Sequence, residues 1–211
     1  MTSPAQSVGE EIANSASHGI ALLAVIAATL PLMAFDRCQT LASFIGSMVF
    51  AGTMVCVYLT STIYHALPGG HAKQVLLKLD HVAIFLFIAG SYTPFALSTR
   101  IEKPDWTLLG AVWLMAIFGM ALKVSNCLKQ PWLSTTVYVL MGWLVLIAAL
   151  PLIGHLPGAS VTWLVAGGFA YTAGTFFFMM DARMRYAHAV WHVFVALGTA
   201  CHYQAVRSIA V

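Results

Sequence analysis

Charged side chains are scarce in this chain of 211 residues: Asp, Glu, Lys and Arg make up 8% of it, whereas 60% of the residues are hydrophobic. A soluble domain carries roughly 25% charged residues. The chain therefore has too few charged groups to cover a surface that faces water. This scarcity excludes a soluble globular domain and predicts a polytopic membrane protein.

Paired cysteines are also missing, since the four cysteines are scattered and form no CxxC pair. This spacing favours neither a disulfide framework nor a thiolate metal site. Basic stripes with interleaved aromatic residues are absent too, so nothing in the sequence predicts a nucleic-acid partner. Protein partners are not indicated by any motif.

Residues 1–17 contain no Lys or Arg and no apolar core. A secretory signal peptide needs both a basic start and an apolar region, so we do not interpret this segment as one. No stretch of the sequence looks like an appended soluble domain. We therefore expect one seven-transmembrane domain over residues 1–211, with a short polar segment at residues 1–10.

Apolar stretches long enough to cross a membrane recur along the chain. A spanning helix needs about 20 mostly apolar residues, and the few charges mark where these stretches end. The stretches lie at about residues 12–35, 41–64, 81–99, 106–122, 133–150, 160–180 and 187–206. The sequence thus predicts an all-α integral membrane protein, a bundle of seven transmembrane helices.

The ten basic residues are divided unevenly between the two sides of the predicted bundle. The side of the N-terminus holds Lys73, Lys78, Lys123, Lys129, Arg183 and Arg185. The opposite side holds Arg37, Arg100, Lys103 and Arg207. Because cytoplasmic loops are enriched in Lys and Arg, this bias favours a cytoplasmic N-terminus.

The unusual polar residues converge on that same inner face. They lie at the end of the second predicted helix, at the start of the third and seventh, and on one face of the first. They are Ser61 and His65; Asp80 and His81; His188 and His192; and Glu11, Asn14 and His18. Ionisable residues inside a membrane mark functional sites by default.

The spacing of two of these residues indicates a metal site. His188 and His192 are four residues apart, so one helical face offers both imidazoles to a single ion, as in HExxH helices. His65, at the same depth, adds a third imidazole. Three imidazoles and one open position are the arrangement of a catalytic zinc site. Imidazole also binds iron, copper and nickel. His202 lies fourteen residues beyond His188, about 21 Å along a helix, and is too far away to join them.

Other interpretations of these polar residues remain open. Proton relays and interhelical hydrogen bonds compete with metal binding as roles for intramembrane histidines. Glu11, Asn14 and His18 share a helical face by their spacing, and a structural polar cluster that closes the inner face is a simple interpretation of them. We expect His81 to face away from Asp80 on the same helix, and assign it no role.

Three segments together resemble a known family. The segments are Ser61–His65, which has the pattern SxxxH, "KLDHVAIFLFIAGSYTPF", which contains Asp80, and "HAVWHVFVALGTACHYQAV". They are similar to segments of the hemolysin III group. This group is the bacterial branch of the PAQR family, which includes the adiponectin and progestin receptors. The resemblance extends from about residue 10 to residue 206. It implies seven helices in a bacterial inner membrane with the N-terminus in the cytoplasm.

The resemblance also implies a zinc site. Its three ligands map onto His65, His188 and His192, the aspartate that bonds the zinc-bound water maps onto Asp80, and the motif serine maps onto Ser61. The long N-terminal region of the eukaryotic receptors has no counterpart here, which argues against a hormone-receptor role.

From these residues we expect a zinc-dependent hydrolase that acts on a membrane lipid amide or ester, as a ceramidase does. Asp80 would act as general base and Ser61 would hydrogen-bond the water or the developing oxyanion. The alternatives are a non-enzymatic protein of membrane homeostasis or signalling with a structural zinc, and a cytolytic protein. Seven mostly apolar helices show no ring of charges for a conduction path, which disfavours a pore.

Overall fold

The structure, a computed structural model, describes residues 6–32, 40–98, 103–128, 130–148 and 150–209. Every regular element within these ranges is a helix. The helices are α1 (Val8–Leu32), α2 (Leu41–Ala66), α3 (His71–Ala96), α4 (Trp106–Val124), α5 (Pro131–Ala148), α6 (Leu150–Ile153), α7 (Gly158–Met179) and α8 (Ala187–Ile209). The predicted bundle of seven long helices is confirmed, and the short α6 lies between the fifth and sixth of them.

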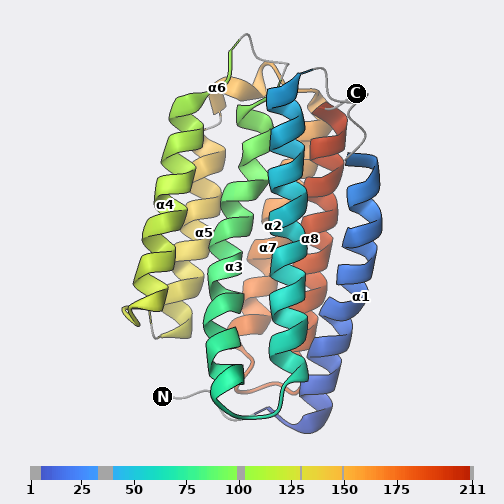
Figure 1. Cartoon of the computed structure of the whole chain (residues 1–211), viewed down its shortest axis with the longest axis vertical. Coiled ribbons are helices and arrows are strands. Elements are labelled where there is room, and N and C mark those ends of the chain that lie inside the picture. The colour runs from blue at the N-terminus through green and yellow to red at the C-terminus, as the bar shows by residue number, and fades with distance from the viewer. Residues whose placement is uncertain (1–5, 33–39, 99–102, 129, 149, 210–211) are drawn as a thin grey trace.

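The long helices run roughly parallel to one axis and pack side by side (Figure 1). Each packs against the next long helix in the chain, and α1 also packs against α8, so that the seven close into a ring. The most extensive contacts join α2 to α3 and α7 to α8. Since α1 contacts both α2 and α8, it lies between the helix that carries His65 and the helix that carries His188 and His192.

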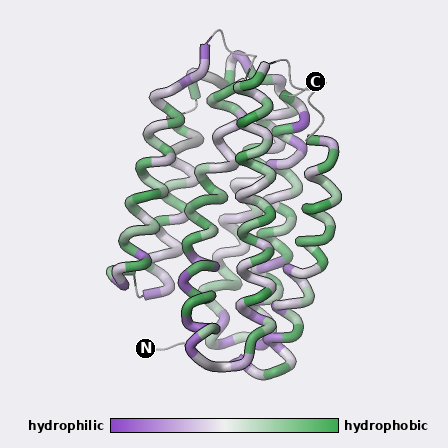
Figure 2. Tube along the Cα trace, viewed as in Figure 1, coloured by the Kyte–Doolittle hydropathy of each residue, from purple (hydrophilic) through white to green (hydrophobic). Residues whose placement is uncertain are grey.

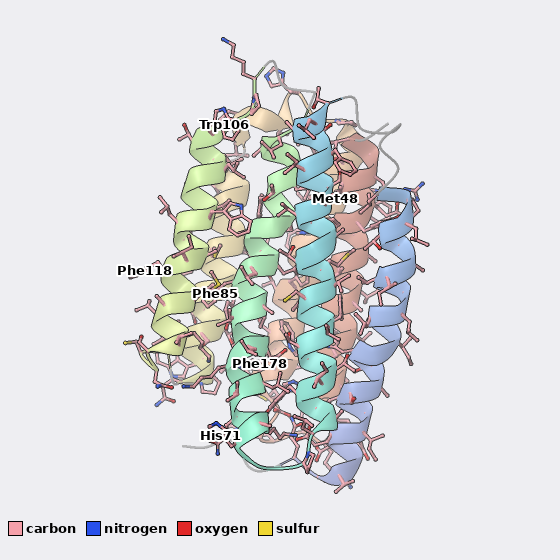
Figure 3. The ribbon with its side chains drawn as sticks, in the orientation of Figure 1. Met48, His71, Phe85, Trp106, Phe118 and Phe178 are labelled. Atoms are coloured by element: carbon pink, nitrogen blue, oxygen red, sulfur yellow. The ribbon has the colours of Figure 1, made fainter. Side chains whose placement is uncertain are left out.

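Hydrophobic residues predominate along most of the length of the bundle (Figure 2). Large side chains such as Leu23, Leu114 and Phe118 are about two-thirds exposed, and Phe118 projects outward from α4 (Figure 3). Among the described residues, α1, α2, α3, α4 and α7 are each long and apolar enough to cross a membrane. The chain is a multi-pass membrane protein.

Among the helix boundaries, the start of α3 differs most from the sequence prediction. The third apolar stretch was predicted to begin at residue 81, but α3 begins at His71. Charges limit the part of a helix that can lie in hydrocarbon, and they do not end the helix itself. The first turns of α3 therefore carry Lys73, Lys78 and Asp80 at the polar end of the bundle, where His71 also lies (Figure 3).

Close packing of α7 on α8 depends on glycines, among them Gly167 and Gly198. A Cβ atom at Gly198 would overlap the Tyr171 ring, and one at Gly167 would overlap the His202 ring. In a bilayer the association of helices depends on van der Waals packing and hydrogen bonds, so small residues at the interface allow the backbones to approach. This packing fixes the position of α8, and with it the two histidines near its start.

Candidate metal centre

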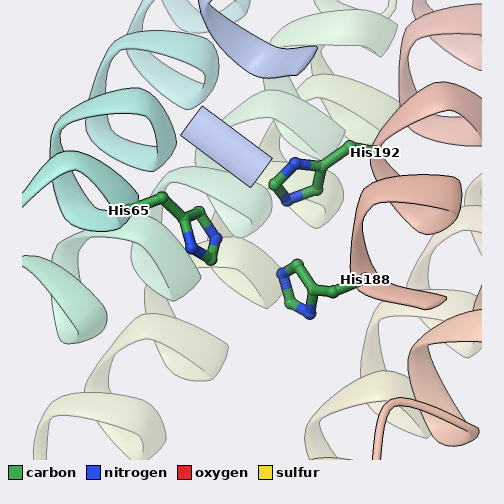
Figure 4. Close-up of side chains that lie close together, drawn as sticks. All are labelled: His65, His188 and His192. Atoms are coloured by element: carbon green, nitrogen blue, oxygen red, sulfur yellow. The ribbon is translucent and has the colours of Figure 1, made fainter. Parts of the chain in front are cut away.

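Three imidazoles meet near the polar end of the bundle. His65 comes from the last turn of α2, and His188 and His192 from the first two turns of α8. One ring nitrogen from each can be chosen so that all three lie within 4.8 Å of one another. The rings point toward a common space between the two helices (Figure 4).

The ring of His65 shows which nitrogen faces that space. Its Nδ1 lies 2.8 Å from Oε2 of Glu11. Because a carboxylate only accepts, Nδ1 carries the hydrogen and Nε2 offers a lone pair. This Nε2 is buried and has no hydrogen-bond partner within the described part of the chain. Leaving a buried polar atom unpaired costs about 1–3 kcal/mol, a cost that a bound ion would remove.

The other two rings have the same arrangement. Nδ1 of His188 lies 3.2 Å from Oδ2 of Asp181, and Nδ1 of His192 lies 3.1 Å from the backbone oxygen of Asn14. All three Nδ1 atoms are thus engaged with acceptor oxygens, so each neutral ring is left with Nε2 as its ligand atom. Metal-binding histidines almost always donate the N–H of the ring nitrogen that does not bind the metal in this way. The residues fit a zinc ion, for which three imidazoles and an open position are a known catalytic set.

Asp80 and Ser61 line the same cavity as the three histidines. Ser61 is buried on α2, one turn before His65. The Asp80 carboxylate on α3 is close enough to interact with the Ser61 hydroxyl, with His188 and with Lys123. Asp80 does not belong to the group of ligand atoms, so its position suits a partner of a water rather than a ligand.

The remaining polar residues take different positions. Nδ1 of His81 lies 2.6 Å from the carbonyl oxygen of Leu77 in its own helix. His202 packs edge-on against Tyr171, with ring centroids 5.3 Å apart, and stays outside the cluster as predicted. His18 stacks on the ring of His192, with centroids 3.5 Å apart. Both ring nitrogens of His18 are buried without a hydrogen-bond partner among the described residues.

Sequence reasoning missed the role of two acidic contacts. Glu11 was placed on the right helical face, but its bond to His65 depends on how α1 packs against α2. Asp181 lies in the turn after α7 and follows no helical periodicity. Only its distance of seven residues from His188 could have drawn attention to it.

A large cavity extends from these residues into the bundle. Its volume is about 1910 Å³. Apolar and aromatic side chains form most of its wall beyond the polar end, including Phe87, Tyr92, Trp143, Leu164 and Tyr171. His202 lines it as well. The cavity therefore connects the three histidines with the apolar interior of the membrane domain.

The chain matches the family described as Haemolysin-III related over residues 6–203. It is 37% identical to Hemolysin-3 of Bacillus cereus over 201 residues, which cover 95% of this chain and 91% of that protein. It is 38% identical to the Hemolysin-3 homolog of Bacillus subtilis (strain 168) over 194 residues, covering 92% and 91%. It is also 26% identical to the human Monocyte to macrophage differentiation factor over 203 residues, covering 93% and 83%. The chain belongs to the haemolysin-III related family.

Proposed function

We propose that the protein is a zinc-dependent hydrolase of a membrane lipid amide or ester. The observation that supports this most is the set of three imidazoles whose Nδ1 atoms are all engaged, so that three Nε2 atoms face one space at the polar end of an apolar cavity. We further propose that this end of the bundle faces the cytoplasm of a bacterial inner membrane, as the distribution of Lys and Arg favours.

His65, His188 and His192 would hold the zinc ion, which would supply Lewis acidity and would lower the pKa of a water that it binds to about 7. Asp80 orients the attacking water through its carboxylate and accepts the proton that the water loses, which is the role of a general base. Ser61 donates its hydroxyl hydrogen to the oxygen on which negative charge develops as the carbonyl is attacked. Asp80 lines the cavity beside His188, and Ser61 lines it beside His65.

The cavity favours a lipid as substrate. Ordinary small-molecule pockets occupy roughly 300–1,000 Å³, and this one, at about 1910 Å³, has room for a long acyl chain. Its wall is aromatic and aliphatic, while the polar groups lie at one end. An amphiphile would thus place its carbonyl among the polar residues and its chain in the apolar part.

A structural role for the ion is the rival proposal. His65 belongs to α2 and the other two histidines belong to α8, so an ion would tie these two helices together without any chemistry. A closed shell of four protein ligands supports this rival, whereas a water in the fourth position supports catalysis.

The test begins with metal analysis of the protein purified in detergent, followed by turnover of an acyl-amide lipid and of the matching ester. We expect about one zinc per chain in the wild type, and loss of both metal and turnover in His192→Ala. His155→Ala removes an exposed imidazole outside the cluster and serves as the control. Wild-type protein without bound transition metal, or undiminished turnover in His192→Ala, would refute the proposal.

A further inference from the structure

The carboxylate of Glu11 connects two partners across three helices. Its Oε2 lies 2.8 Å from Nδ1 of His65 on α2, and its Oε1 lies 2.7 Å from Nζ of Lys73 on α3. The side chain of His65 is 1% exposed and that of Glu11 is 22% exposed. Lys73 also donates to the carbonyl oxygen of Leu67, which ends α2. The carboxylate is therefore held from one side while it faces the histidine on the other.

Asp181 takes the same position behind His188. Its Oδ2 lies 3.2 Å from Nδ1 of that histidine. The amide nitrogen of Gln6 lies 3.0 Å from the same carboxylate oxygen, and the amide oxygen of Gln6 accepts from the side chain of Asn14 at 2.6 Å. Since the backbone oxygen of Asn14 faces Nδ1 of His192, one hydrogen-bonded chain joins the outer sides of both α8 histidines.

From this geometry we infer that Glu11 and Asp181 are positioning residues, which hold His65 and His188 with Nε2 toward the ion and so set metal affinity. The inference rests on the proposed function, because it needs a metal at the three histidines. α1 contributes no ligand, yet Glu11 and the carbonyl of Asn14 orient two of the three ligand rings. Carboxylate partners also make the ligand imidazoles more basic.

A purely structural account would assign Glu11 only to its ion pair with Lys73. That pair is partly exposed, with the side chains 16% and 22% accessible. Lys73→Met removes the ion pair but keeps the bond between Glu11 and His65. Glu11→Ala removes both. Comparing the two variants therefore separates the positioning role from the structural one.

The experiment measures zinc affinity by competition with a chromophoric chelator, using the full chain in detergent. We expect Glu11→Ala to bind zinc about 10–100-fold more weakly than the wild type, and Asp181→Asn to bind it more weakly as well. Lys73→Met should change affinity by less than about fivefold, the effect of a partly exposed ion pair.

Glu10→Ala is the matched control. Glu10 neighbours Glu11 on the same helix, and its carboxylate bonds Ser7 and the backbone of Tyr186 instead of a ligand histidine. We expect its zinc affinity to equal that of the wild type. Glu11→Gln keeps an acceptor for His65 and should recover part of the affinity, which also tests the inference if Glu11→Ala does not fold.

A second measurement uses Co²⁺ in place of zinc. The visible absorption of bound Co²⁺ reports ligand geometry, so it should change in Glu11→Ala and stay the same in Glu10→Ala and Lys73→Met. Wild-type protein that binds no metal would refute the proposed function, and the inference with it. If the wild type binds zinc but Glu11→Ala, Glu11→Gln and Asp181→Asn bind it equally well, the inference fails alone. An equal loss in Glu11→Ala and Lys73→Met also refutes it.

Discussion

Replacing His192 by alanine should separate two contributions to stability, one that needs metal and one that does not. His192 is 2% exposed and its ring stacks on His18. Its Nδ1 atom lies within hydrogen-bonding distance of Asn14 and Ser17. Truncating such a group leaves a cavity and unpaired polar atoms, which cost about 1–3 kcal/mol for the hydrogen bonds alone. This loss should be the same with and without zinc.

The second contribution appears only when zinc is added. A ligand that binds the folded state alone stabilises it by about 2.7 kcal/mol at 100 times its dissociation constant. In a chain of this size 1 kcal/mol moves the melting temperature by roughly 2–4 °C. We therefore expect zinc to raise the melting temperature of the wild type by roughly 5–10 °C, and to leave that of His192→Ala unchanged.

The assay is thermal unfolding in detergent, followed by circular dichroism or intrinsic fluorescence, with a chelator and with a defined excess of zinc. His155→Ala should respond to zinc as the wild type does, because its exposed side chain lies outside the cluster. An equal shift in the wild type and in His192→Ala would refute the reasoning, since the stabilising ion would then bind elsewhere.

Three further outcomes test the site and the packing around it. Asp80→Asn should keep zinc but lower kcat for lipid hydrolysis by about 10²–10⁴-fold, the contribution of a general base; retained turnover in a steady-state assay would exclude that role. Gly198→Leu should destabilise the bundle by about 1–3 kcal/mol, because the new side chain would meet the Tyr171 ring. A melting temperature equal to that of the wild type would contradict the tight packing of α7 on α8. Thr199→Val should cost about 1–3 kcal/mol because its hydroxyl bonds both Tyr58 and Tyr171; unchanged denaturation by heat would show that these bonds contribute nothing.

The involvement of α1 in the site was only partly predictable. The spacing of Glu11, Asn14 and His18 on one helical face indicated a polar cluster, and the structure packs that face against α2 and α8. Spacing gave no sign that Asn14 would act through its backbone oxygen, or that Gln6 would connect it to Asp181. The spacing of side chains along a sequence does not indicate contacts that the backbone makes.

Composition alone determined the class of the protein. Charges are too costly in hydrocarbon to be scattered at random, so they mark the ends of the spans, and seven helices followed from their positions. The pairing of His188 with His192 was equally local, because residues four apart on a helix share a face. The tertiary structure decided the rest. His65 is more than a hundred residues from His188 in the chain, and only the packing of α1, α2 and α8 against one another brings these imidazoles within one ligand sphere. Which nitrogen His65 and His192 present depends on Glu11 and Asn14, partners that are adjacent in space and distant in sequence.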